Sequence, residues 1–343
     1  MRPTIEDLAQ VAGVSRATVN RVIGRPHKVK AATRQLVVDA AAEIGYHGFS
    51  TLKMNVQGNK KPFRLTLLLQ APNPWFVEQM SKTLRVARDQ IEHRRKIILK
   101  TERLIDFSPE ALAERLLALG RKSDAVALVA AEHPIVTRAI EQLAQERIPV
   151  YALVTTLSAP SLAGYIGLNG RKFGRTAAWA LDRLCGHPEK LGILVGSPRY
   201  REHELAESGF RSYFLDHDQA VQVLDALPTY ESEGIAREMT ERLLSQNPDM
   251  NGLFLAGGGT SGVLSALRDS GRANEIATIA IDLTEESRAA LLDGTLDIVI
   301  AHPFPDIGQS ALELIISKAD GDPFQGRTMT YVNLNLITAE NVE

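Results

Sequence analysis

The chain has 343 residues, 44% of them hydrophobic and 23% charged, which suggests two or three folded domains and argues against a disordered chain. Its single cysteine, Cys185, excludes an internal disulfide framework or thiolate zinc site. Met1 to Ala12 has no signal-like apolar core, and no run reaches the ~18 apolar residues of a membrane helix, so we expect a cytoplasmic protein without membrane contacts. Residues 1–62 carry a net charge of +6 and residues 63–343 carry −8. Such a basic head indicates either a local polyanion-binding site or a solvated basic face.

The basic head has the pattern of a helix-turn-helix. Thr4 begins a first amphipathic helix that ends at Gly13, which can adopt the left-handed conformation of a tight turn. Ser15 is a good N-cap for a second helix over residues 16–23. A third helix is expected over residues 31–44. The alternative is an unrelated three-helix bundle, and the basic, polar second helix argues against it.

Residues 4–22, TIEDLAQVAGVSRATVNRV, resemble the N-terminal signature of the lactose-repressor (LacI/GalR) family of bacterial transcription regulators. The likeness continues through Val29, Thr33-Arg34 and residues 41–46. It implies a sequence-specific DNA-binding repressor that binds a pseudo-palindromic double-stranded operator as a homodimer. Its operator affinity would be controlled by a small effector.

The resemblance also implies which residues contact DNA. Arg16, Ala17 and Arg21 match positions that meet base edges in the major groove, where an arginine can bind guanine bidentately. Asn20, in the same helix, stands where the family usually has serine. The matching phosphate-binding positions are Ser15, Thr18, Lys28, Lys30, Thr33 and Tyr46.

The expected linker, residues 49–62, follows a DNA-binding domain of residues 1–48. Proteins of this family usually have a hinge helix here, whose leucine enters the minor groove. Leu52, Met54 and Val56 are the apolar candidates, but they alternate at period two, and Asn55 aligns with the wedge leucine. The linker is therefore either an atypical hinge helix or a plain flexible tether.

From Phe63 onward, short apolar runs alternate with helical patterns, which predicts parallel sheets covered by helices. This region, residues 63–343, resembles the ribose-binding type of periplasmic binding protein, which these regulators use as an effector domain. The resemblance implies two α/β lobes, with crossovers near Leu168, His302 and Gly326. The expected N-lobe comprises residues 63–168 and 303–326, and the C-lobe residues 169–302 and 327–343.

A small molecule is expected in the cleft between the lobes, where strand ends converge. Trp75 and Phe76 suit the apolar face of a sugar, polyol or cyclitol, although they could instead pack the lobes together. Asp282 matches an aspartate that accepts hydroxyl protons in the family, and His302 stands where glutamine is common. The full set of expected effector residues is Asn73, Trp75, Phe76, Arg199, Arg201, Asp282 and His302.

Some positions depart from the family pattern and leave the effector's identity open. Val154-Thr155-Thr156 replaces an Asp-Arg pair, and neither Arg199 nor Arg201 matches the family arginine cleanly. The run from Ala256 to Gly262 follows a strand and opens a helix, so its N–H groups could bind the phosphate of a phosphorylated sugar. Because it lacks the lysine of a P-loop, we interpret it as a close-packed cleft wall.

We expect no enzymatic activity, catalytic residue, metal site or cofactor. No paired-carboxylate, nucleophile–base or metal-ligand spacing stands out, and the eight histidines are scattered. The alternative hypotheses are a sugar-binding or sugar-modifying protein with the basic head as an accessory module. Turnover of a labelled sugar would support the enzyme.

Overall fold

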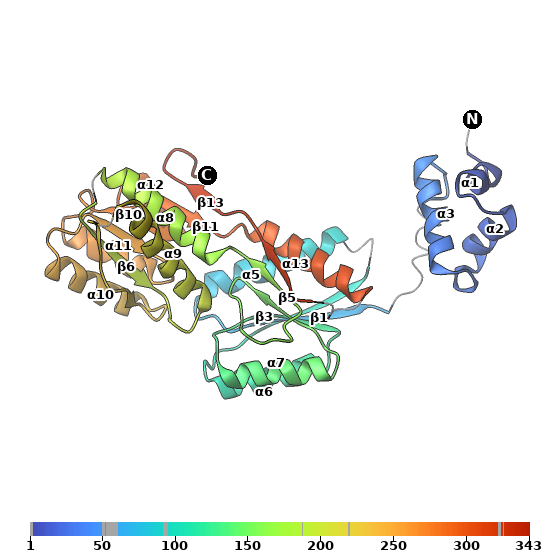
Figure 1. The fold of residues 1–343 in the computed structure, drawn as a ribbon, viewed down its shortest axis with the longest axis horizontal. Coiled ribbons are helices and arrows are strands. Elements are labelled where there is room, and N and C mark those ends of the chain that lie inside the picture. Colours follow the sequence, from blue (N-terminus) through green and yellow to red (C-terminus); the bar gives the residue numbers. More distant parts are fainter. Residues whose placement is uncertain are drawn as a thin grey trace. The chain divides into compact units, whose positions relative to one another are not determined.

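The computed structural model describes residues 3–49, 52, 61–91, 95–186, 188–218, 220–321, 324 and 326–343. The chain divides into a helical head and a larger α/β body, each with its own hydrophobic core. Both are drawn in Figure 1. Two of the predicted hinge residues, Met54 and Val56, lie outside the described residues, as does Asn55.

The head contains the three predicted helices. They are α1 (Ile5–Val11), α2 (Arg16–Gly24) and α3 (Ala31–Glu43), with a short 3-10 turn, η1 (Pro26–Lys28), before α3. Thr4 and Asp7 cap α1 reciprocally, and the Ser15 hydroxyl accepts the N–H of Thr18 at 3.2 Å to begin α2. Gly13 has φ +63°, which confirms the predicted left-handed turn between the first two helices.

The head core joins all three helices. Leu8, Val19 and Val37 are fully buried in it. Leu52 is also buried there, only 2% exposed, and its N–H donates to the carbonyl of Gly48 at 2.8 Å. The placement of Leu52 in a separate linker is therefore corrected, because burial among the head helices removes its apolar surface from water. The packed head extends past residue 48.

The first lobe of the body is built on a sheet of six described strands in the order β12-β5-β4-β3-β1-β2. Helices α6 and α7 cover one face and α5 and α13 the other (Figure 1). The strands are β1 (Phe63–Leu69), β2 (Ile97–Arg103), β3 (Ala125–Val129), β4 (Val150–Leu153), β5 (Gly164–Gly167) and β12 (Thr328–Tyr331). The helices are α5 (Pro74–Ile91), α6 (Pro109–Gly120), α7 (Pro134–Gln145) and α13 (Phe304–Ala319).

The second lobe has a sheet of seven described strands in the order β13-β11-β10-β9-β6-β7, with β8 also paired to β6. Its strands are β6 (Lys190–Val195), β7 (Gln222–Val223), β8 (Leu227–Pro228), β9 (Gly252–Leu255), β10 (Ala277–Ile281), β11 (Ile298–Ala301) and β13 (Asn335–Ile337). Its helices are α8 (Gly170–Cys185), α9 (Arg201–His217), α10 (Glu233–Gln246), α11 (Thr260–Asp269) and α12 (Glu285–Asp293). Apolar cores lie on both faces of this sheet, as the continuous apolar strands predict.

The chain passes between the lobes at three places. The first two crossovers, after β5 and after β11, lie where they were predicted. The third does not lie near Gly326, because β12 still pairs in parallel with β5 of the first sheet. Only β13 joins the second sheet, antiparallel to β11. Residues 327–331 therefore belong to the first lobe, and the crossover falls at residues 332–334.

Close helix packing in the second lobe explains two of the sequence landmarks. A Cβ atom at Gly174 of α8 would clash with the backbone of Ala206 in α9, and one at Gly209 would clash with the backbone of Arg171. Glycine at both positions lets the two helices approach. Within the described part of the chain, no helix is both long and apolar enough to cross a membrane.

Candidate functional site

The second helix of the head exposes the polar side chains that the sequence singled out. Arg16, Ala17 and Arg21 are all exposed on α2, while Val19 and Val22 face the core. Arg16 forms a 2.6 Å ion pair with Glu6 of α1, and both side chains are more than half exposed. A pair this exposed is weak and is easily exchanged for another partner. The exposed guanidinium groups of Arg16 and Arg21 are therefore available to bind another partner.

The remaining head residues divide by exposure. Ser15, Asn20, Lys28 and Lys30 are exposed, and Thr18 and Thr33 are half-buried. Tyr46 is only 9% exposed and packs in the head core. Little of its surface is therefore available for a phosphate contact.

The body contains a pocket between its lobes, with a cavity volume of about 120 Å³. Such a space holds several water molecules or one small ligand. Its walls come from the end of β3 and from segments that follow β1, β4 and β5 in one lobe, and from the ends of β6, β8, β9, β10 and β11 or the segments after them in the other. Because these parallel strands all end toward it, the pocket occupies the usual ligand position of open α/β sheets.

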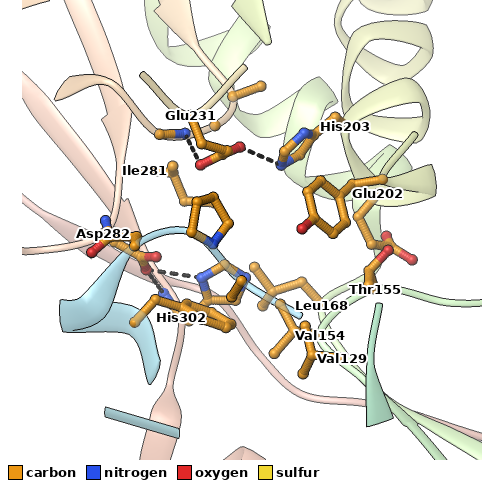
Figure 2. Close-up of a pocket in the computed structure, with 18 of the residues that line it drawn as sticks. Val129, Val154, Thr155, Leu168, Glu202, His203, Glu231, Ile281, Asp282 and His302 are labelled. Carbon is orange, nitrogen blue, oxygen red and sulfur yellow. Dashed lines mark hydrogen bonds and ion pairs between the residues drawn. The ribbon is translucent and has the colours of Figure 1, made fainter. Parts of the chain in front are cut away.

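An aspartate and a histidine are paired in one wall (Figure 2). The Asp282 Oδ1 accepts the backbone N–H of His302 at 3.0 Å and lies 2.8 Å from its Nδ1. Burial alone would lower the pKa of His302, but the Asp282 carboxylate, helped by Glu202, raises it above its ordinary value. Asp282 has φ +65°, a conformation that aspartate tolerates better than most residues.

A buried glutamate stands in another wall (Figure 2). The Glu231 Oε2 accepts the N–H of Gly258 at 2.9 Å. Burial, reinforced by the Asp282 carboxylate, raises the pKa of Glu231 to about 7. Its Oε1 lies 4.0 Å from Nε2 of His203, too far for a hydrogen bond. Burial lowers the pKa of His203 to about 4, so this neighbour is a neutral imidazole rather than an ion-pair partner.

A second glutamate links the lobes beside the pocket. The Glu202 Oε1 accepts the N–H of Thr156 at 3.3 Å. Burial raises the pKa of Glu202 to about 7, while the Thr156 N–H and the Tyr165 hydroxyl act in the opposite direction. The lobes are also joined by the Tyr200 hydroxyl, which donates to the Gln70 carbonyl at 2.8 Å. These bonds hold the lobes together over the cavity.

Aromatic rings form the apolar part of the wall. Trp75 and Phe76 line the pocket at the start of α5. Both also pack edge-on against Phe304, with centroids 5.7 and 5.9 Å apart, and Phe76 meets His302 at 6.4 Å. The contacts with Phe304 lie within the first lobe, and only the Phe76–His302 contact reaches the second, so both rings remain available to a ligand.

The lining of the pocket offers little to an anion. None of the described residues lining it is Lys or Arg. The N–H of Gly258 is already bound by Glu231, and that of Gly262 by the Glu233 carboxylate at 2.7 Å. These two carboxylates support the interpretation of the glycine run as a cleft wall and count against its use as a phosphate site. The described residues also contain no group of three or more His, Cys, Asp or Glu placed to hold a metal ion.

Comparisons with known proteins identify both parts of the chain. Residues 4–48 match the bacterial regulatory proteins of the lacI family, and residues 71–323 match the periplasmic binding protein domain. The Escherichia coli K12 transcriptional regulator IdnR is 23% identical over 337 residues, covering 96% of this chain and 95% of its own. The chain belongs to the lacI family of regulators. It is a DNA-binding transcription regulator with a periplasmic-binding-protein body.

Two further comparisons describe the parts of this lacI-family regulator separately. The sucrose operon repressor of Vibrio alginolyticus is 51% identical over 43 residues, covering 12% of this chain and 46% of its own. GanP, a glucose-galactose binding protein from Geobacillus stearothermophilus, matches the fold with a TM-score of 0.75 at 16% identity. That match covers 82% of this chain and 99% of GanP.

Most of the effector residues expected in this regulator do line one pocket: Asn73, Trp75, Phe76, Asp282 and His302. Arg199 and Arg201 do not, and their assignment to it is corrected. Both side chains are exposed just before and at the start of α9, and the Arg199 carbonyl accepts the N–H of Glu132. The following residues of α9 face the cavity instead.

Seven polar residues of the pocket are absent from the expected effector set: Thr155, Tyr200, Glu202, His203, Glu231, Thr260 and Thr284. Glu202 and His203 were hidden in the charged stretch that opens α9. Glu231 follows β8, which has only two residues and therefore gives no apolar run in the sequence. A usable signal was the apolar strand ending at Val195, since polar residues that follow a parallel strand face the cleft.

Proposed function

We propose that this regulator is a homodimeric repressor whose operator affinity is set by a small sugar, polyol or cyclitol-like effector bound between its lobes. The observation that carries the proposal is the pocket between the lobes, which is lined by aromatic rings and by carboxyl and hydroxyl groups. Rings suit the apolar face of such a ligand, and carboxylates accept its hydroxyl protons. Because its target is DNA, we also propose a cytoplasmic location.

The homodimer follows from the size of the head. One helix-turn-helix reaches only a half-site, and a two-fold dimer places a second recognition helix on the other half of a pseudo-palindrome. Arg16, Ala17 and Arg21 would read base edges, and the phosphate-contact residues would set the register. Met54 and Val56 remain candidates for hinge contacts.

The effector would act by favouring one arrangement of the lobes. A ligand that contacts Phe76 on one lobe and Asp282 on the other binds best at one angle between them. In a dimer, that angle would set the distance between the two heads. Only a ligand with unequal affinity for the two arrangements shifts DNA binding.

A thermal-shift screen with neutral sugars, polyols and cyclitols tests the proposal, because a ligand that binds only the native state raises the melting temperature. A hit should lose its effect in Phe76→Ala and keep it in Phe107→Ala. Phe107 is the matched control, since it is exposed and lies outside the pocket. A hit that stabilises both variants equally binds elsewhere and would refute the proposed site.

A further inference from the structure

We propose that the natural effector carries a basic nitrogen, as in an amino sugar or an aminocyclitol, bound as a cation beside Glu231 and Asp282. This inference rests on the proposed function, because it names the chemical class of ligand for the same pocket. Four features of the described residues support it: a glutamate oxygen without a partner, a hydroxyl without a partner, the pocket's charges and its aromatic rings.

The Glu231 carboxylate has one oxygen bound and one unused. Its side chain is only 13% exposed, Gly258 binds Oε2, and Oε1 accepts no hydrogen bond from any described residue. A Cβ atom at Gly196 or Gly258 would clash with this carboxylate, so the surrounding backbone leaves space for it. A buried acceptor of this kind is costly unless a ligand completes it.

Thr155 supplies a second unused group on the opposite lobe. Thr155 is 4% exposed and lines the pocket, and its Oγ1 has no hydrogen-bond partner among the described residues. A hydroxyl can donate to and accept from a ligand hydroxyl. Both unused oxygens are covered by neighbouring atoms, so a ligand with an ammonium group toward Glu231 and a hydroxyl toward Thr155 would bind after these side chains turn toward it.

The charges around the cavity are unbalanced toward the acidic side. Glu202, Glu231 and Asp282 all line it, and no described lining residue is Lys or Arg. The imidazole of His302 is engaged by Asp282, and burial keeps the pKa of His203 too low for it to carry charge at neutral pH. A neutral ligand would leave Glu231 either as an uncompensated buried charge or protonated, whereas a cation pairs with it.

The aromatic lining favours the same class of ligand. Trp75, Phe76 and Tyr200 line the cavity, and an alkylammonium group is attracted to the face of such rings.

Binding of a cation should also change the protonation of Glu231. Burial raises the pKa of Glu231 to about 7, so a cation bound beside it would displace a proton. Binding of an amine near pH 6.5 should therefore release protons.

Titration calorimetry on the full chain tests the proposal with matched pairs of ligands. The probes are D-glucosamine against D-glucose, D-galactosamine against D-galactose, and an inosamine against myo-inositol. At pH 6.5, in two buffers of different ionisation enthalpy, the amine of at least one pair should bind about 10-fold tighter or more and release protons. Neutral partners that bind as tightly or more tightly overturn the proposal but leave the proposed function standing. Failure of every compound to bind overturns both.

The variant Glu231→Gln tests whether the charge of Glu231, rather than the shape of its side chain, causes the preference for an amine. Glutamine keeps an oxygen for the N–H of Gly258 but removes the charge, so the preference for the amine over its hydroxyl counterpart should fall about 10- to 100-fold. Glu204→Gln is the control, since Glu204 is exposed on α9 and lies outside the lining, and it should keep the full preference. A melting curve of each variant verifies folding. An unchanged preference in a folded Glu231→Gln protein overturns the proposal.

Discussion

Asp282→Asn should destabilise the body in a pH-dependent way. The two side chains of the pair are buried, with Asp282 13% and His302 9% exposed, and one Asp282 oxygen faces both the backbone N–H and Nδ1 of His302. Asparagine tolerates the positive φ and keeps an acceptor, so the change removes mainly the charge. A hydrogen bond to a charged group contributes about 1.5–3 kcal/mol to the free energy of unfolding.

The sign of the pH dependence follows from the raised pKa of His302. The pKa of His302 in the folded protein lies above its unfolded value of 6.5. Protonated His302 therefore stabilises the folded state fully at pH values below 6.5, and this stabilisation is lost as the pH rises through the folded pKa. The melting temperature of Asp282→Asn should therefore lie about 3–12 °C below the wild-type value at pH 5.5. The difference should shrink by pH 9. Removing the Asp282 charge also lowers the raised pKa of Glu231, which shrinks the deficit at high pH in the same direction.

Thermal melts of both proteins at the two pH values, followed by circular dichroism, measure this directly. Asp216→Asn is the control, because Asp216 pairs with Arg175 at the surface with 58% of its side chain exposed. That change should have a small effect at either pH. An equal deficit for Asp282→Asn at pH 5.5 and pH 9 would show that His302 is not a cation in the folded protein and would refute the reasoning.

Three further predictions concern the head and the assembly. Arg16→Ala should relax base preference at one position per half-site, at a cost of about 1–3 kcal/mol in binding free energy. Lys28→Ala should weaken binding to all DNA sequences and make the dependence of affinity on salt shallower. If both variants lose affinity equally for all sequences, Arg16 does not read a base. Leu52→Ala should destabilise the head by about 2–5 kcal/mol in a denaturation curve, because it empties a buried site, and a smaller cost than 1 kcal/mol would contradict that packing. Light scattering at micromolar concentration, with and without operator, should give the mass of a dimer, and a monomer in both cases would refute the assembly.

The main elements of the fold were predictable because their signals are local. Buried parallel strands such as β3 form continuous apolar runs, and the caps at Thr4 and Ser15 mark helix starts. Strand β5 has no comparable signal, because it is four residues long and has glycine at both ends. The misplaced third crossover has a similar cause, since the edge strand β12 is short and only half-buried and gives no apolar run.

The site was predictable only where a residue follows a strongly apolar strand. Asp282 and His302 come directly after β10 and β11, and both lie in the pocket. Their pairing depends on β10 and β11 lying side by side with Ile281 opposite Ile300, and the spacing of 20 residues in the sequence does not show that register. Glu231 was beyond sequence reasoning, since its burial depends on glycines from two other segments. Sequence spacing carries no information on that kind of packing.

An operator titration with and without a pocket ligand tests the central claim most directly. The operator would be selected from random double-stranded DNA, and binding followed by fluorescence anisotropy with a ligand identified by calorimetry. The predicted result is a change in operator affinity of about 5- to 150-fold, corresponding to a coupling of about 1–3 kcal/mol, that Asp282→Ala abolishes. A ligand that occupies the pocket at saturation and leaves the operator affinity of the wild-type protein unchanged would contradict it.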